Sequence, residues 1–218
     1  MFALLPYLMH KKIRLVDGFF IRNHLDPEFP IMRYPSISGT SPRYYIPTNE
    51  IWMDKQFAKE KHFFVALEKI RYDKKYQKLP YKKMRQIMTK ELCKKGPVPN
   101  FIQATEKKEK MIIQYVDGSR VRQHLDAEFI FGGHEYVYDY IPHNEIWIDN
   151  LQNQKEIPHT LLHEMIEYTH MKAGMNYDAA HDIATAFEKA KRREDGVASY
   201  PGDENYTNKF VIPYARKK

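Results

Sequence analysis

The feature that most constrains the fold of this 218-residue chain is an internal repeat. The run VDGFFIRNHLDPEF at residues 16–29 recurs as VDGSRVRQHLDAEF at residues 116–129, with nine of 14 positions identical. The run YIPTNEIWMD at residues 45–54 recurs as YIPHNEIWID at residues 140–149, with eight of ten positions identical. Because the two runs keep their order in both halves, we predict an internal tandem duplication.

Each copy is predicted to form a small antiparallel sheet followed by two helices, so the predicted fold class is α+β. Short apolar segments at residues 13–16 and 111–116 are typical of strands. An Asp-Gly pair follows each segment and favours a tight hairpin, with return strands at Phe19–Arg22 and Arg120–Arg122.

A further strand is expected in each copy, at Tyr44–Asp54 and Tyr136–Asp149, where aromatic and β-branched residues predominate. The proline near the start of each run belongs at the edge or entry of a strand. The predicted domains are residues 1–105 for the first copy and 106–195 for the second, followed by an extended tail at 196–218.

The chain shows no sign of a membrane anchor. Its apolar opening, Met1–Met9, is too short to cross a bilayer and lacks the flanks of a signal peptide, so a packed strand or an anchoring arm is expected. A single cysteine, Cys93, excludes an internal disulfide framework and a cysteine-based zinc cluster. We therefore expect a cytoplasmic protein, or alternatively a virion component, without a membrane partner.

Charge is distributed unevenly between the two halves of the sequence. The net charge is +7, but residues 1–110 carry +12 and residues 111–218 carry −5. The basic half is predicted to bind nucleic acid or a large protein assembly such as a virion, and the alternative is a solvated helix face. The residues expected to contact a polyanion are Lys74, Lys75, Lys82, Lys83 and Arg85.

The second copy carries chemically active residues on a predicted helix. Pro158 is typical of the first turn of a helix, and Gly174 is typical of the position just after its end. A helix between them places His163 and Glu167 one turn apart on the same face. Glu164 lies beside His163.

A second helix is expected to begin after the N-cap residue Asn176 and to present His181 and Glu188 on one face. The short connection makes the two helices antiparallel neighbours, whose polar faces can meet. An imidazole and a carboxylate one turn apart, with a third ligand from the neighbouring helix, suit a divalent cation that keeps one position open for water.

The run His163-Glu-Met-Ile-Glu167 resembles the HExxH helix of zincin metallopeptidases. That resemblance implies a metal-dependent peptidase in which His163 and Glu167 are metal ligands and Glu164 is the general base. His181 is our candidate for the third ligand. Glu188 is a weaker candidate, either as a spare ligand or as a partner that supports one of the ligands. Because glutamate replaces the second histidine of the motif, zinc is expected, with manganese or iron as alternatives.

The wider pattern over about residues 111–190 also resembles a group of small microbial and phage proteins, and this second resemblance implies no established activity. If the enzyme is a peptidase, the strand Tyr140–Asp149 is expected to pair with an extended peptide substrate at an exposed sheet edge. The alternative is a non-enzymatic structural or interaction protein with a vestigial metal site.

The repeat provides an internal comparison for these hypotheses. Residues 67–72 lie opposite residues 162–167, and the apolar positions match whereas the candidate ligands do not. Residues that recur in both copies are instead predicted to serve the fold. These residues are His24, His124, Asp26, Asp126, Trp52 and Trp147.

Overall fold

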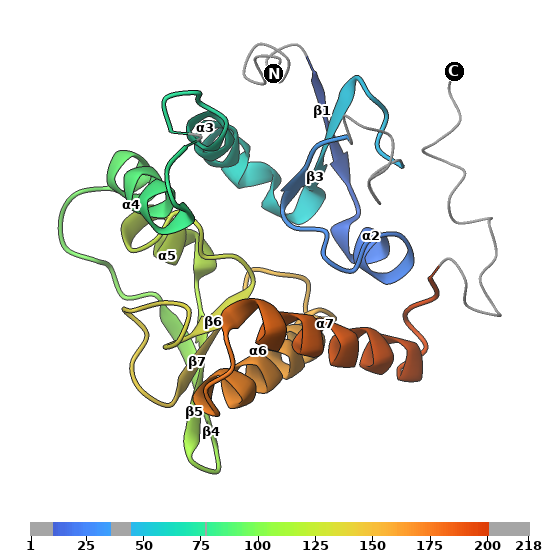
Figure 1. Ribbon diagram of the computed structural model, residues 1–218, viewed down its shortest axis with the longest axis vertical. Coiled ribbons are helices and arrows are strands. Elements are labelled where there is room, and N and C mark those ends of the chain that lie inside the picture. Colours follow the sequence, from blue (N-terminus) through green and yellow to red (C-terminus); the bar gives the residue numbers. More distant parts are fainter. Residues whose placement is uncertain (1–10, 36–44, 77, 201–218) are drawn as a thin grey trace. The chain divides into compact units, whose positions relative to one another are not determined.

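The computed structural model describes residues 11–35, 45–76 and 78–200 (Figure 1). The strand or arm predicted at Met1–Met9 lies outside the described residues, and so does most of the predicted tail. No helix in the described part of the chain combines the length and the apolar character needed to span a membrane.

The chain divides into two compact units, each of which contains residues from both halves of the sequence. The first unit combines Met1–Phe64 with Lys189–Lys218, and the second unit is Val65–Glu188. This division falls inside helices α3 (Lys61–Arg71) and α7 (Tyr177–Glu194). The division at residue 105 stays a prediction from the sequence.

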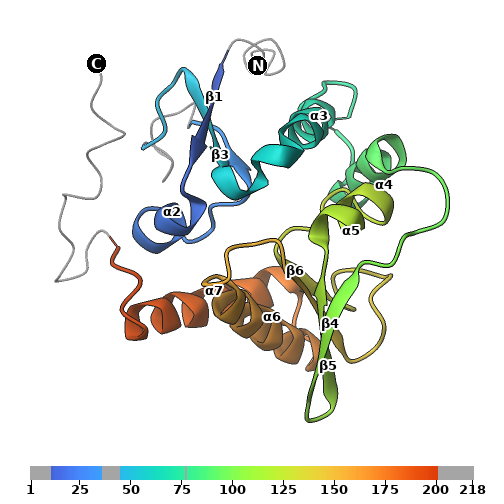
Figure 2. The ribbon, with the colours of Figure 1, turned by 180° about the vertical axis from the view of Figure 1, so that it is seen from behind.

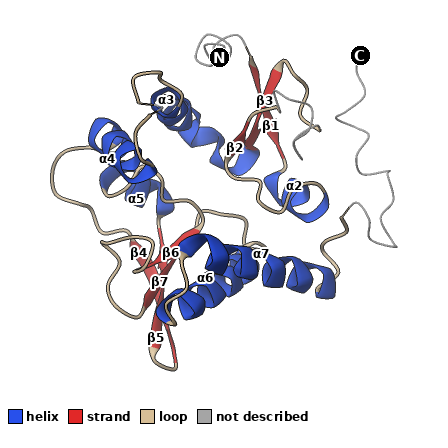
Figure 3. Ribbon diagram, viewed as in Figure 1, coloured by secondary structure: helices blue, strands red, loops and turns tan. Residues whose placement is uncertain are grey.

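The first unit contains a three-stranded sheet in the order β1–β3–β2 (Figure 3). Strand β1 (Lys12–Val16) runs parallel to β3 (Glu50–Asp54), and β2 (Met32–Arg33) runs antiparallel to β3. Helix α2 (Gly18–His24) follows β1, and the 3-10 helix η1 (Lys55–Glu60) leads from β3 into α3.

The core of the first unit lies around the fully buried Trp52, which packs with apolar residues of β1 and α2 and of the segments that follow α2. The end of the described chain completes this unit. The Arg192 guanidinium at the end of α7 donates to the side-chain oxygen of Asn23 at 2.9 Å. The Tyr200 hydroxyl donates to the carbonyl of Arg22, also at 2.9 Å.

The second unit contains a four-stranded sheet in the order β4–β5–β7–β6. Strands β4 (Ile102–Lys108) and β5 (Met111–Val116) form an antiparallel hairpin. Strand β7 (Glu145–Asp149) is parallel to β5, and β6 (Gly132–His134) is antiparallel to β7. The remaining helices of this unit are α4 (Tyr81–Leu92), α5 (Gly118–His124) and α6 (Ile157–Lys172).

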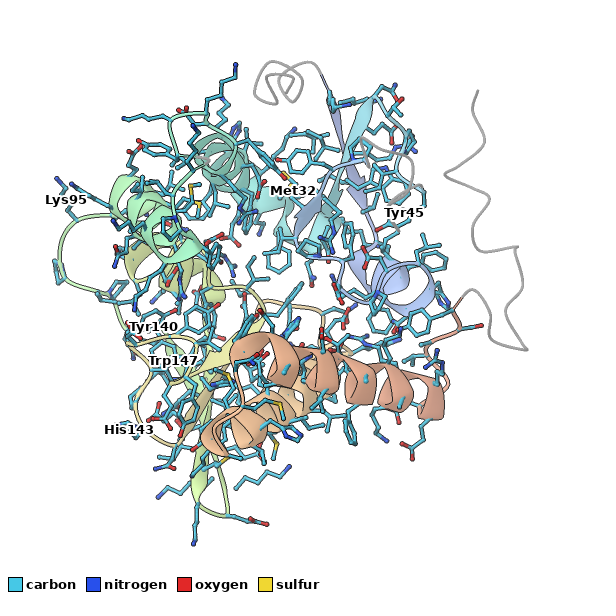
Figure 4. The ribbon with its side chains drawn as sticks, viewed as in Figure 1. Met32, Tyr45, Lys95, Tyr140, His143 and Trp147 are labelled. Atoms are coloured by element: carbon cyan, nitrogen blue, oxygen red, sulfur yellow. The ribbon has the colours of Figure 1, made fainter. Side chains whose placement is uncertain are left out.

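Two buried clusters lie on this sheet. One contains Trp147 and Tyr140, whose ring centroids are 5.6 Å apart (Figure 4). The other contains Ile113, Ile146 and Tyr168, against which apolar residues of α6 pack. This second cluster holds α6 beside β6 and β7, an arrangement that Figures 1 and 2 show from opposite sides.

The described residues form helices and two small sheets, an architecture compatible with α+β, but the hairpins predicted at the Asp-Gly pairs are wrong. Residues 18–24 and 118–124 form helices, not return strands. The Asp17 carboxylate accepts the backbone N–H of Phe20 at 3.1 Å, and Asp117 caps α5 in the same way. Aspartate at such a position satisfies a free N–H of the first turn and so starts a helix.

The prediction of purely antiparallel sheets is also wrong. Strands β1 and β3 are parallel, as are β5 and β7, because parallel neighbours need a crossover connection and the segments containing α2 and α5 provide it. Regular pairing is also shorter than expected, since only Glu50–Asp54 and Glu145–Asp149 of the two long predicted runs are strands.

The same local features occur at equivalent positions of both repeats. Val16 pairs with Asp54 in one sheet, and Val116 pairs with Asp149 in the other. In each case the buried aspartate forms an ion pair with an arginine of the helix that follows the first strand of the parallel pair, at 3.0 Å in the first repeat and 2.7 Å in the second. These arginines are Arg22 and Arg122.

Candidate metal centre

Three of the predicted ligands converge between α6 and α7. The Nε2 atom of His163 lies 3.1 Å from Nδ1 of His181 and 3.6 Å from Oε2 of Glu167. The Nδ1 atom of His181 is 2.9 Å from the same Glu167 oxygen. One ligand atom of each residue therefore lies within 4.8 Å of the other two, which is close enough for all three to bind one ion.

Local sequence explains how the two helices bring these atoms together. Pro158 lies in the first turn of α6, and Gly174 follows the end of the helix with a φ of 93°. The turn is short, and α7 begins where the Asn176 side-chain oxygen accepts the backbone N–H of Ala179 at 3.0 Å. A glycine after one helix and an asparagine before the next define both helix ends.

Glu188 contacts the cluster from its outer side. Its carboxylate accepts a hydrogen bond from Nδ1 of His163 at 2.9 Å. A carboxylate that holds one ring nitrogen of a histidine fixes the tautomer and leaves the other nitrogen free to bind a metal. Of the two roles predicted for Glu188, the geometry matches the supporting one.

A third histidine, His134, belongs to the same cluster, although it was not among the residues predicted from the sequence. It lies at the end of β6 and is fully buried, with Nε2 at 3.1 Å from Oε1 of Glu167. His134, Glu164 and Glu167 form a second group whose ligand atoms lie within 4.8 Å of one another. The only sequence signal was a histidine after Gly132-Gly133, in a segment where the repeats do not align.

Glu164 is buried against the edge strand β6. A Cβ atom at Gly132 would lie 2.9 Å from Cγ of Glu164, so only glycine leaves room for this carboxyl group as it is placed. The prediction of a carboxylate beside the metal ligands therefore agrees with the geometry.

The environment drives the pKa values of the two buried carboxyl groups apart. Burial and the adjacent Glu167 carboxylate raise the pKa of Glu164 to about 7. Burial alone would raise the pKa of Glu167, but hydrogen bonds from His134, His163 and His181 hold it well below its usual range. The cluster thus combines one carboxyl group that titrates near neutral pH with one that stays ionised, a separation typical of acid–base sites.

The pKa of His163 is raised by its carboxylate partners, because they stabilise the charged imidazolium form. Burial would lower it, but hydrogen bonds to Glu167 and Glu188 raise it to about 10. Tyr177, the first residue of α7, stacks on the ring of His181 with centroids 5.4 Å apart. The His181 imidazole is therefore in contact with the Glu167 carboxylate and with the Tyr177 ring.

The predicted polyanion residues do not form a uniform group. Lys74, Lys75, Lys82 and Lys83 are exposed, around the connection between α3 and α4 and the first turn of α4. Arg85 is instead held by Asp126, and its guanidinium also donates to the carbonyl of Val137 at 3.2 Å. Polyanion binding by the four lysines stays a prediction.

The strand expected to pair with a peptide does not offer an edge. Strand β7 lies between β5 and β6, so both of its sides are already paired. The neighbouring edge strand β6 is short and buried. The sheet therefore gives no support for substrate pairing along Tyr140–Asp149.

The aspartates and tryptophans that recur in both repeats make contacts within the fold, whereas the structural role predicted for His24 and His124 stays a prediction. The carboxylates of Asp26 and Asp126 accept backbone N–H groups two residues further on, at 3.1 and 2.9 Å. Both tryptophans are buried, and each donates its indole N–H to a glutamate two residues earlier.

The single cysteine, Cys93, is partly buried, and its thiol donates to the carbonyl of Arg122 at 3.2 Å.

Comparison with known proteins gives no family for this chain. No family model matches it, and no curated protein and no solved structure matches it either. Its function is therefore inferred from the geometry of the His/Glu cluster.

Proposed function

We propose that the protein is a metal-dependent hydrolase whose metal is held by His163, Glu167 and His181. The convergence of Nε2 of His163, Oε2 of Glu167 and Nδ1 of His181 carries this proposal. Two imidazoles and one carboxylate form a ligand set of the kind found in catalytic zinc sites, where a water molecule takes the fourth position.

Glu164 is the proposed general base. A divalent metal lowers the pKa of a bound water to about 7, which makes hydroxide available at neutral pH. Without a metal the pKa of Glu164 is about 7, and a divalent cation nearby would lower it, so the carboxylate would be ionised and able to accept a proton at neutral pH. Glu164 is adjacent in sequence to His163 and belongs to the group that contains Glu167, so its carboxylate would be near enough to take a proton from a water held by the metal.

Zinc is the proposed cofactor, with manganese or iron as alternatives. Histidine and carboxylate ligands bind all three metals, and tetrahedral geometry with an open position favours zinc. A peptide is the proposed substrate solely through the resemblance of the HExxE run to the zincin helix.

The ligands are confined to the second repeat. Arg33 pairs with Trp52 in the first sheet, and Gly133 pairs with Trp147 in the second, so Arg33 and Gly133 occupy equivalent positions. The next residue along the chain is Tyr34 in the first repeat and His134 in the second. The first repeat therefore has a tyrosine at the position of His134. We infer from these positions and from the repeated sequence runs that the chain arose by duplication and that only the second copy holds the metal.

The proposal predicts stoichiometric metal binding by the full chain. Protein stripped of metal is titrated with zinc, manganese and iron, and bound metal is measured by elemental analysis after gel filtration. The double variant His163→Ala/His181→Ala is expected to lose the metal bound at these ligands. His170→Ala is the matched control, because His170 lies on the same helix but in neither ligand group, and it is expected to bind as the parent does.

Glu164→Gln separates metal binding from catalysis. The amide cannot accept a proton at neutral pH, so hydrolysis of a peptide library is expected to fall by about 100-fold or more while metal at His163, Glu167 and His181 is retained. A parent protein that binds no metal would overturn the enzyme proposal in favour of a structural or interaction protein.

A further inference from the structure

A second set of ligand atoms lies on the other side of Glu167. Oε2 of Glu167 faces His163 and His181, whereas Oε1 faces Nε2 of His134 at 3.1 Å. A carboxylate with one oxygen toward each of two ligand groups has the geometry of a bridging ligand. Glu164 completes the second group.

One side chain of this second group lacks a hydrogen-bond partner. Glu164 is only 9% exposed, and within the described part of the chain its carboxylate receives no hydrogen bond. Buried polar groups are normally paired, so a carboxylate left in this state beside the Glu167 carboxylate indicates a missing cationic partner.

We propose that a second divalent cation binds between His134, Glu164 and Glu167, with Glu167 bridging it to the metal at His163 and His181. The inference rests on the proposed function, because it adds an ion to the same centre. The charges agree with it: Glu164, Glu167 and Glu188 bring three negative charges to the cluster when the imidazoles are neutral.

The second ion changes what Glu164 can do. A carboxylate that binds a cation through its oxygens is a much weaker proton acceptor, so the centre with two ions lacks its general base. The hydrolytic form is then the one with a single ion, and the cation at His134 acts as an inhibitor. Activity is expected to rise with the first equivalent of metal and to fall with the second.

Manganese provides a direct test on the full chain. Two Mn²⁺ ions bridged by a carboxylate lie about 3.5–4 Å apart and are magnetically coupled. The parent is expected to bind about two equivalents by elemental analysis and to show a coupled electron paramagnetic resonance signal. His134→Gln keeps a side-chain N–H that can donate to Glu167 but is a poor ligand, and it is expected to bind one equivalent with an uncoupled signal.

Control variants make the outcomes distinct. His143→Ala removes an exposed histidine of the same unit and is expected to keep both equivalents. Thermal unfolding of each variant checks that it is folded, and His134→Asn replaces His134→Gln if the latter is not. One equivalent in the parent overturns the second ion and leaves the proposed function standing, whereas no bound metal overturns both. Two coupled ions in His134→Gln overturn the assignment of His134.

Discussion

At the scale of single residues, a buried ion pair fixes the second repeat. Arg122 and Asp149 are both fully buried and lie 2.7 Å apart, and Asp149 also accepts the backbone N–H of Gly118. A Cβ atom at Gly118 would lie 2.0 Å from the Asp149 carboxylate, so the helix can approach the strand only through a glycine. The pair links α5 to the end of β7, from which the chain leads to the metal centre.

Arg122→Met is expected to destabilise the protein by about 3–5 kcal/mol, because it leaves the Asp149 charge buried without its partner. Urea unfolding followed by circular dichroism measures the change. Arg120→Met is the matched control on the same helix, since Arg120 pairs with Asp117 while half-exposed, and its loss is expected to cost less than about 1 kcal/mol. Equal losses in the two variants would contradict this account.

At the scale of elements, the start of α7 determines whether the proposed metal ligands meet. His181 lies in the second turn of this helix, so fraying of the first turn would move its imidazole away from His163 and Glu167. Asn176 opposes fraying by accepting the N–H of Ala179. Helix capping at this point is therefore coupled to the geometry of the site.

Asn176→Ala is expected to lower stability by about 1 kcal/mol and to weaken metal affinity, because an N-cap side chain contributes about that much. Asn176→Asp keeps a side-chain acceptor and is expected to retain both properties. Calorimetric titration with zinc, together with thermal unfolding, measures the two effects. A full-affinity, fully stable Asn176→Ala protein would show that packing alone holds α7 in place.

At the scale of the whole molecule, all proposed ligands belong to one of the two compact units. His134, His163, Glu164, Glu167 and His181 lie within Val65–Glu188. Each unit has one of the two tryptophans, with Trp52 in the first and Trp147 in the second. The two units can therefore be followed separately by fluorescence.

Zinc at 100 times its dissociation constant is expected to stabilise the second unit by about 2.7 kcal/mol. The Trp52→Phe variant leaves Trp147 as reporter, and its urea midpoint should rise on adding zinc. Trp147→Phe reports on the first unit through Trp52, and its midpoint should move less. Equal shifts at both tryptophans would mean that the two units unfold together.

The sequence alone determined the local features of the site. A proline, a glycine and an asparagine at Pro158, Gly174 and Asn176 predicted the ends of α6 and α7, since these effects act within one or two turns. Helical spacing then predicted that His163 and Glu167 share a face and that His181 meets them from the next helix. The structure agrees at each of these positions.

Only the tertiary structure decided how distant segments pair. The Asp-Gly pairs are compatible with hairpins, but the same aspartates, Asp17 and Asp117, can also cap a helix. A buried aspartate from a later strand, Asp54 or Asp149, holds each of these helices against the sheet through Arg22 or Arg122. Parallel pairing likewise depends on contacts made across a crossover. His134 enters the site through the pairing of β6 with β7, which local sequence does not encode because the partner lies beyond an intervening loop.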